Sequence, residues 1–204
     1  CTSAAADSRS DPMQPSFAFD SAADALAAVT AAITDDQLAD PTPCADVTVR
    51  DLLAHAVGLT EAFRQAATKE SVGTSAPPQT GPDTPLPAEW RALLPGRLKA
   101  LAEAWRDPAA WDGDAEAGGV TMPAPVMAMV ALDELVVHAW DLAVATGQSP
   151  RASDADLAVL LEFLRETDPE GTPGLFGPVI PVAPEAPLLD QVLGLTGRDA
   201  AWSR

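Results

Sequence analysis

The stretch Ala131–Gly147, ALDELVVHAWDLAVATG, limits what this chain can fold into more than any other part of it. Together with the residues just before it, it is apolar almost all the way round a helix, which is typical of a helix buried on every side. Prolines at positions 123 and 125 are tolerable only in the first turn of such a helix, and Gly147 is a natural end. The apolar positions are Met127, Met129, Val130, Leu132, Leu135, Val136, Val137, Trp140, Leu142 and Val144.

Three ionisable residues share one side of this apolar helix. At about 100° per residue, Glu134, His138 and Asp141 fall within roughly 60° of one another. Isolated charges at such depth are costly, so these groups should be paired, neutralised or bound to a ligand. A divalent metal is a suitable partner, because it accepts a carboxylate and a neutral imidazole from positions i and i+4.

The chain contains two histidines, and the other one, His55, lies in TVRDLLAHAVGLTEAF. It falls within an apolar helical stripe, so both histidines are expected to point into a core. If the two helices pack side by side, His55, Glu134 and His138 form a set of three metal ligands. Three protein ligands leave one coordination position open, which is typical of a catalytic rather than a structural zinc site. The stripe consists of Leu52, Ala56, Leu59 and Phe63.

Helical periodicity elsewhere predicts an all-α fold. We expect helices over residues 21–33 (capped by Asp20 or Ser21), 48–68 (capped by Thr48 with Asp51), 88–105, 153–165 (capped by Ser153) and 187–195, in addition to the central one. No convincing strand pattern is present, and residues 107–125 are expected to form a loop. The predicted architecture is an antiparallel four-helix bundle with a C-terminal helical arm. The expected regions are a flexible leader (1–19), a metal-binding bundle (20–148), and a helix with a proline-rich arm packed on the bundle (149–204).

Composition restricts partners and location. The balance of 12 basic and 30 acidic residues gives a net charge of −18, which argues against nucleic acid or an anionic membrane as a partner. No apolar run reaches the roughly 18 residues that a membrane span needs. Two cysteines without CxxC spacing fit a reducing, cytoplasmic location. Cys1, followed by small residues, also suits a lipoprotein anchored through that cysteine. A monomer and a homodimer both remain open.

Three stretches, PTPCADVTVRDLLAHAVG, ELVVHAWDLAVATG and LFGPVIPVAPEAPLLDQVLGLTGRDAAW, resemble signatures of a known family. They are similar to actinobacterial metal-binding proteins of the DinB-like superfamily, related to the N-terminal domain of mycothiol-dependent maleylpyruvate isomerase. The resemblance runs from about Ala22 to Trp202. It implies a DinB-like four-helix bundle whose metal, usually zinc, is held by His55, Glu134 and His138. It also implies mycothiol as the thiol co-substrate.

The chain departs from this family pattern in two ways. Val47 stands where tryptophan is common, which affects local packing behind the second helix but not the ligands. The larger isomerase carries a further C-terminal domain, and we expect this chain to be too short to contain it. Substrate groups from that domain would then be absent, so isomerisation of maleylpyruvate itself is not implied.

Other polar residues near these motifs have competing interpretations. Asp141 could accept a hydrogen bond from a metal-bound histidine or be a spare metal ligand. The competing interpretation is a salt bridge or a charge on the helix face. Arg50 is expected to pair with Asp51 at a helix start rather than reach an anionic substrate. Cys44 is expected to serve packing rather than act as a nucleophile, because no histidine lies near it in sequence. Met127 and Trp140 are expected in the core. A ferritin-like di-iron site, a GxSxG hydrolase and a phosphate loop are excluded by missing motifs.

The leading hypothesis is a metal-dependent enzyme that uses a small-molecule thiol, as a mycothiol-type S-transferase or isomerase acting on a small electrophile. A bound metal lowers the pKa of a thiol and makes the thiolate available at neutral pH. Hydrolysis by a metal-activated water is a neighbouring option. The alternative from another class is a metal- or ligand-binding bundle without turnover. A closed coordination shell, with Asp141 as a fourth ligand, would favour that alternative.

Overall fold

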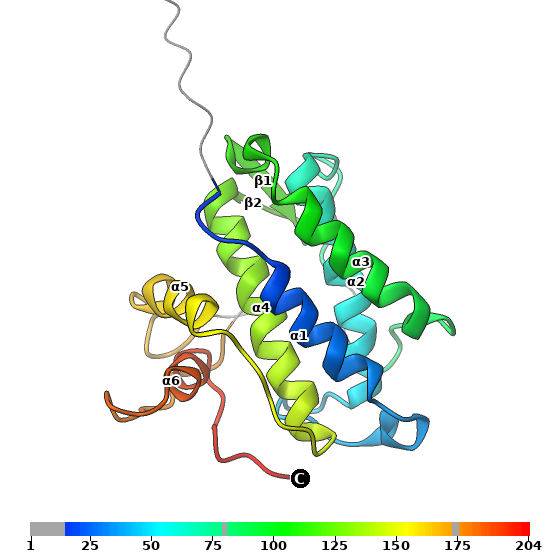
Figure 1. The fold of residues 1–204 in the computed structure, drawn as a ribbon, viewed down its shortest axis with the longest axis vertical. Helices are drawn as coiled ribbons and strands as arrows, with labels where there is room; N and C mark the ends of the chain where they lie inside the picture. The colour runs from blue at the N-terminus through cyan, green and yellow to red at the C-terminus, as the bar shows by residue number, and fades with distance from the viewer. Residues whose placement is uncertain (1–14, 79–80, 173–175) are drawn as a thin grey trace, which may run out of the picture.

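Four long helices form the body of the protein, and two shorter ones lie beside it (Figure 1). The computed structural model describes residues 15–78, 81–172 and 176–204. The long helices are α1 (Asp20–Ala31), α2 (Val49–Thr68), α3 (Trp90–Ala104) and α4 (Ala124–Ala145). The shorter ones are α5 (Asp154–Leu164) and α6 (Leu188–Leu195), and the 3-10 helices are η1 (Asp35–Ala39) and η2 (Pro108–Trp111). The predicted four-helix bundle with a C-terminal helical arm is confirmed.

The helices of the bundle are not all antiparallel to their neighbours. Helices α1 and α2 each pack against both α3 and α4. Gln148, just after α4, donates to the carbonyl of Val29 near the end of α1 at 3.1 Å, so these two helices run in the same direction. Trp105, just after α3, donates to the carbonyl of Phe63 in the second half of α2 at 3.1 Å, so α2 and α3 are also parallel. The expectation of an antiparallel bundle is therefore wrong for these pairs, because the chain crosses back along the bundle between α2 and α3.

Helix α2 begins where the sequence predicts. The Thr48 hydroxyl accepts from the amide of Asp51 at 3.3 Å, and the Asp51 carboxylate accepts from the amide of Thr48 at 3.2 Å. This capping box satisfies two backbone donors that a helix start leaves free. The first residue of α2 is thus fixed, and with it the direction in which His55, nearly two turns further on, projects.

Helix α4 is buried along almost its whole length, as its composition predicts. Pro123 precedes its first residue and Pro125 lies in its first turn. At its end Gly147 adopts a φ of 71°, and the amide of Gln148 donates to the carbonyl of Ala143 at 2.8 Å. This is a Schellman ending, which glycine permits without strain. Helices α1, α2 and α5 all pack on α4.

A two-stranded antiparallel hairpin precedes α4, where we expected only a loop. Strands β1 (Asp114–Ala117) and β2 (Val120–Pro123) are joined by two glycines with φ values of 60° and 77°, which is typical of a tight hairpin turn. The expectation of no strand is wrong here because four-residue strands are too short to show alternation. The Glu116 carboxylate ties the hairpin to the loop after α2, accepting from the amide of Gly73 at 2.6 Å and the hydroxyl of Ser75 at 2.6 Å.

The residues just before α1 belong to the packed core. Phe19 is 1% exposed, and the ring of Phe17 lies 5.1 Å from that of Trp111. Both phenylalanines fall in the expected leader 1–19, whereas residues 1–14, including Cys1, lie outside the described residues. No side chain caps the start of α1, so the expected cap from Asp20 or Ser21 is wrong.

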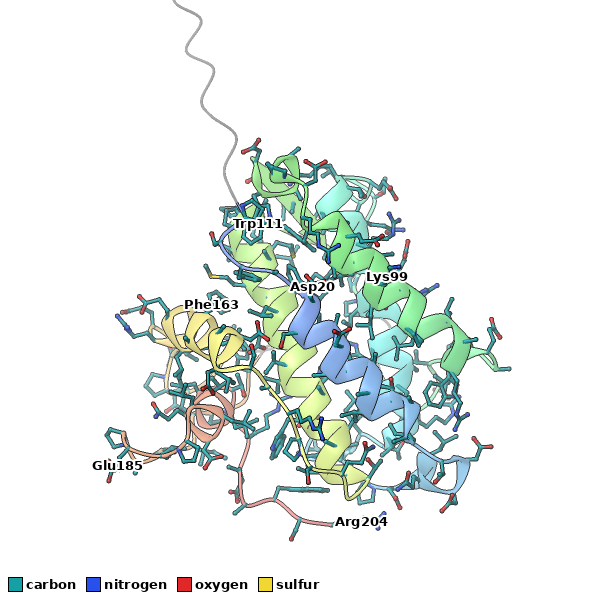
Figure 2. All side chains as sticks on the ribbon, viewed as in Figure 1. Asp20, Lys99, Trp111, Phe163, Glu185 and Arg204 are labelled. Carbon is teal, nitrogen blue, oxygen red and sulfur yellow. The ribbon has the colours of Figure 1, made fainter. Side chains whose placement is uncertain are left out.

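The arm after α4 packs on the bundle through α5, and α6 packs on α5. Ser153 caps α5 as predicted, with its hydroxyl accepting from the amide of Asp156 at 3.1 Å. Trp111 marks the hairpin end of the bundle, and Arg204 lies toward the opposite end (Figure 2). Among the described helices, none is both long enough and apolar enough to cross a bilayer.

Candidate metal centre

The three residues predicted as ligands meet where α2 faces α4. One oxygen of Glu134, Oε2, lies 2.9 Å from Nε2 of His138 and 3.3 Å from Nε2 of His55. The two imidazole rings are 5.1 Å apart between centroids and nearly perpendicular, at 89°. The candidate donor atoms of the three residues all lie within 4.8 Å of one another. The structure thus brings together the set that the sequence singled out.

These three donors are partly buried and strongly coupled. The side chains of His55 and Glu134 are each 20% exposed and that of His138 is 11% exposed, so the cluster opens to solvent on the side of the first two. Burial opposes ionisation of Glu134, but the charge and hydrogen bonds of the histidines outweigh burial and hold its pKa well below its usual range. Burial likewise opposes protonation of His138, yet Glu134 and Asp141 raise its pKa well above 6.5.

The donor chemistry of this cluster fits a divalent ion. Two imidazole nitrogens and one carboxylate oxygen are the ligands that zinc takes in catalytic sites. The raised pKa of His138 favours the doubly protonated, positively charged ring, and a metal ion at the same place would replace the proton on Nε2. The ionised Glu134 supplies the negative charge in either case.

Asp141 contacts the other side of the His138 ring. Its Oδ2 lies 2.9 Å from Nδ1 of His138 and 3.2 Å from Nη2 of Arg198, and the residue is fully buried. Burial alone would raise the pKa of Asp141, but the hydrogen bond from His138 and the charge of Arg198 lower it. With Nδ1 donating to Asp141, Nε2 is the nitrogen of His138 that faces Glu134, and it would bind a metal in exchange for its own proton. Both interpretations of Asp141, as histidine partner and as salt-bridge residue, therefore describe its contacts.

Sequence reasoning missed two neighbours of Asp141. The Cys44 thiol donates to Oδ2 of Asp141 at 3.3 Å, and Nη2 of Arg198 lies 3.6 Å from the Cys44 sulfur. Donor atoms of Cys44, His138 and Asp141 also lie within 4.8 Å of one another. We expected Cys44 to serve packing alone because no histidine is close to it in sequence, but the fold places His138 beside it. The signal for Arg198 in the sequence was a basic residue directly after Gly197, the glycine that follows the last predicted helix.

A further buried acid on α4 was also overlooked. Asp133 is 6% exposed, and one of its oxygens, Oδ1, is buried without a hydrogen-bond partner. Burial, with the adjacent charge of Glu134, raises the pKa of Asp133 to about 7. An acidic residue directly before Glu134 in an apolar run was a signal in the sequence. The sequence did not show that other parts of the chain bury the face of the helix that carries Asp133.

The remaining candidates lie as expected. Arg50 pairs with Asp51 at 3.4 Å and donates to the carbonyl of Thr84 at 3.2 Å, so it serves the start of α2. Met127 and Trp140 are buried, with 1% and 4% exposure. Neither side chain presents a surface for a substrate.

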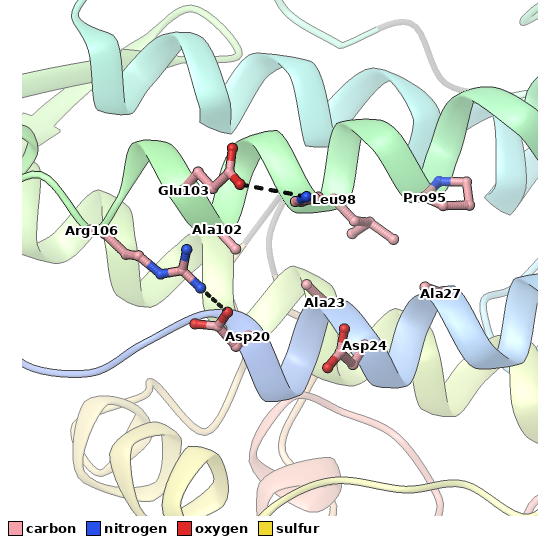
Figure 3. Close-up of a pocket in the computed structure, with 10 residues that line it drawn as sticks. Asp20, Ala23, Asp24, Ala27, Pro95, Leu98, Ala102, Glu103 and Arg106 are labelled. Atoms are coloured by element: carbon pink, nitrogen blue, oxygen red, sulfur yellow. Dashed lines mark hydrogen bonds and ion pairs between the residues drawn. The ribbon is translucent and has the colours of Figure 1, made fainter.

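A surface groove of about 340 Å³ lies between α1 and α3 (Figure 3), on the opposite edge of the bundle from the α2 and α4 pair. Its floor is built from small apolar residues. Four of its charged side chains form ion pairs, Arg106 with Asp20 and Lys99 with Glu103, and Asp24 also lines it. Its lining contains no histidine or cysteine, so the donor set suited to a metal lies at the cluster on α2 and α4.

Comparison with known proteins identifies the family of this chain. Residues 19–143 match the family model described as the mycothiol maleylpyruvate isomerase N-terminal domain. The chain belongs to this family. Two relatives from Mycobacterium tuberculosis, the uncharacterized proteins MT0763 (strain CDC 1551 / Oshkosh) and Rv0738 (strain ATCC 25618 / H37Rv), are each 33% identical over 195 residues, covering 91% of this chain and 98% of theirs. The predicted relation to an actinobacterial DinB-like family is confirmed.

The fold is also that of a solved relative. The crystal structure of the mycothiol-dependent maleylpyruvate isomerase superimposes with a TM-score of 0.62 at 18% identity, over 90% of this chain and 88% of that one. Our expectation that the isomerase carries a further domain absent here is therefore wrong, because the match leaves only a small part of the isomerase uncovered. At this identity the likeness establishes the fold alone.

Proposed function

We propose that this protein is a metal-dependent enzyme of small-molecule thiol chemistry, with a divalent ion, most suitably zinc, held by His55, Glu134 and His138. The observation that carries the proposal is the meeting of these three donors, from two rigid helices, at a place that stays partly open to solvent. The family supports a thiol as the co-substrate, since its solved member is named for its dependence on mycothiol. The electrophile is a small molecule that either forms a bond to the thiol sulfur or is isomerised with the help of the thiol.

The protein residues have distinct tasks in this proposal. His55, Glu134 and His138 would hold the ion, and Asp141 accepts a hydrogen bond from Nδ1 of His138, which leaves Nε2 as the nitrogen that would bind it. Zinc at this place supplies one chemical function, which is to lower the pKa of a bound thiol so that a thiolate exists at neutral pH. Solvent exposure at His55 and Glu134 gives the thiol its approach. Asp141 lies against the opposite nitrogen of His138, which supports a set of three protein ligands rather than a closed set of four.

Metal content by mass spectrometry is the first test, on full-length protein purified without added metal. About one equivalent of zinc or a similar ion is expected in the wild type, and none in His55→Ala or His138→Ala. Glu103→Gln, which removes an exposed acid of α3, is the matched control and should retain the metal. A wild type that is empty and cannot be loaded contradicts the proposal.

Turnover is tested next by incubating the loaded protein with mycothiol and a panel of electrophiles that includes maleylpyruvate and a chlorodinitroarene. Loss of free thiol or isomerisation of the electrophile, absent in His55→Ala, supports the enzyme. Bound metal without either reaction identifies the alternative, a metal-binding bundle without turnover.

A further inference from the structure

One side chain from each of the three signature stretches meets at a single buried atom, Oδ2 of Asp141. Cys44 comes from the turn before α2, Asp141 from α4, and Arg198 from the end of α6. This oxygen also accepts from Nδ1 of His138. Only the contact with His138 forms within one helix, so the other two depend on how distant segments dock.

The end of α6 sets the position of Arg198. The amide of Arg198 donates to the carbonyl of Leu193 at 2.8 Å and that of Gly197 donates to Gly194 at 3.1 Å, which is a Schellman ending. Gly197 has a φ of 77°, and a Cβ there would lie 2.8 Å from backbone atoms of Gly177. Glycine is therefore required at this position, and the residue after it is held in a fixed direction, with its side chain only 15% exposed.

Both terminal nitrogens of Arg198 make contacts within the protein. Its Nη1 donates to the carbonyl of Thr196 at 3.0 Å, and its Nη2 donates to Oδ2 of Asp141 and to the Cys44 sulfur. These contacts hold the guanidinium in one orientation against α4. It neutralises a buried carboxylate and fixes the orientation of that group.

The turn before α2 fixes Cys44 in a similar way. The hydroxyl of Thr42 donates to the carbonyl of Val47 at 2.8 Å, and the amide of Val47 donates to the carbonyl of Cys44 at 3.2 Å. The turn is closed on itself, and it holds the thiol at the edge of α4.

We propose that Arg198, assisted by Cys44, is a positioning residue for the metal centre, through which docking of the C-terminal arm controls metal affinity. The chain of contacts runs from Arg198 and Cys44 to Asp141, and from Asp141 to His138. Because the coupling between two equilibria is reciprocal, metal binding in turn stabilises the docked arm. This inference rests on the metal site proposed above and does not require that the protein turn over a thiol.

The test compares zinc affinity, by chelator competition, in the full-length wild type and in Arg198→Met, Arg198→Lys and Cys44→Ala. Arg204→Met is the matched control, because Arg204 lies on the same arm and pairs with a carboxylate, Asp40, that has no contact with the ligands. Arg198→Met is expected to weaken zinc binding about ten-fold or more. Arg198→Lys should recover part of the loss, and Arg204→Met should bind like the wild type.

Two further readouts separate positioning from loss of structure. Cobalt bound in place of zinc should give an altered visible absorption spectrum in Arg198→Met, because the direction of the His138 ring changes, and an unaltered one in Arg204→Met. Zinc should also slow amide hydrogen exchange across α6 in the wild type but not in Arg198→Met.

Unchanged zinc affinity and cobalt spectrum in a folded Arg198→Met overturn this inference and leave the proposed function intact. Equal losses in Arg198→Met and Arg204→Met also overturn it, since they would report a general effect of the arm. If Arg198→Met does not fold, Arg198→Lys decides, because an affinity and spectrum equal to those of Arg204→Met would overturn the inference. A wild type that binds no metal overturns both proposals.

Discussion

Nδ1 of His138 and Oδ2 of Asp141 lie 2.9 Å apart and three residues apart on one helix. Helical geometry brings the two residues together, and Arg198 from the docked arm holds the Asp141 carboxylate in the orientation that makes the contact. The same helix places Glu134 on the opposite nitrogen of the ring, at 2.9 Å. Residues within one helical turn on either side of His138 therefore determine which of its ring nitrogens faces the candidate metal site.

Asp141→Asn should weaken zinc binding about 10- to 100-fold, the loss usual when the hydrogen-bond partner of a metal-bound histidine is changed. The amide is uncharged and no longer neutralises Arg198, so the His138 ring loses its fixed orientation. Chelator competition measures the effect. Asp156→Asn, which changes another buried acid on α5, is the control and should leave affinity unchanged; equal losses in the two variants would count against a specific role for Asp141.

Zinc should raise the thermal stability of the wild type and leave His55→Ala unchanged. An ion present at 100 times its Kd stabilises the folded state by about 2.7 kcal/mol, which corresponds to a rise in Tm of roughly 5–10 °C for a chain of this size. Calorimetry of the wild type and of His55→Ala, each with zinc and with a chelator, measures the change in Tm. A rise of the same size in His55→Ala would place the bound ion elsewhere.

The three residues of the candidate metal site could be singled out from sequence because each depends on local periodicity. Glu134 and His138 are one helical turn apart in an apolar run, and His55 falls within the stripe of its own helix. The same holds for the start of α2, where Thr48 and Asp51 are neighbours in sequence. These features need no knowledge of how the chain folds back on itself.

The features that escaped prediction depend on contacts between distant segments. Cys44 and Arg198 meet only because a closed turn and the end of α6 both reach α4, and 154 residues separate the two in sequence. The parallel direction of α2 and α3 follows from a long connection whose path the sequence does not specify. The hairpin gave one local signal, the glycine pair at 118 and 119, but its strands are too short for their alternation to be seen.

Glu116→Gln should destabilise the protein at neutral pH but not in acid. Hydrogen bonds from Ser75 and from the amide of Gly73 lower the pKa of Glu116 below its ordinary value of 4.5. A carboxyl group with a lowered folded-state pKa stabilises the protein above its unfolded pKa, and this contribution is lost as the pH falls through the folded value. The Tm of the variant should thus be lower than that of the wild type at pH 7, with the gap closing below about pH 4. Glu103→Gln, at an exposed position, should show no such gap.

Phe19→Ala should lower the free energy of unfolding by about 3–5 kcal/mol, the usual cost of removing a buried aromatic ring. Phe19 is 1% exposed and its ring lies 5.8 Å from that of Trp105. Urea denaturation monitored by tryptophan fluorescence measures the change. Phe163→Ala, at a partly buried position on α5, should cost less. A Phe19→Ala variant within about 1 kcal/mol of the wild type would mean that the segment before α1 contributes little to the core.

The salt bridge between Asp141 and Arg198 joins residues 57 positions apart, so at a synthesis rate of roughly 5–20 residues per second the arginine emerges some 3–11 s after the aspartate. All four bundle helices precede α6 in the chain. During that interval the nascent bundle holds the acids of α4 without the cation that neutralises Asp141. The bundle is therefore complete before the surroundings of its candidate metal centre are.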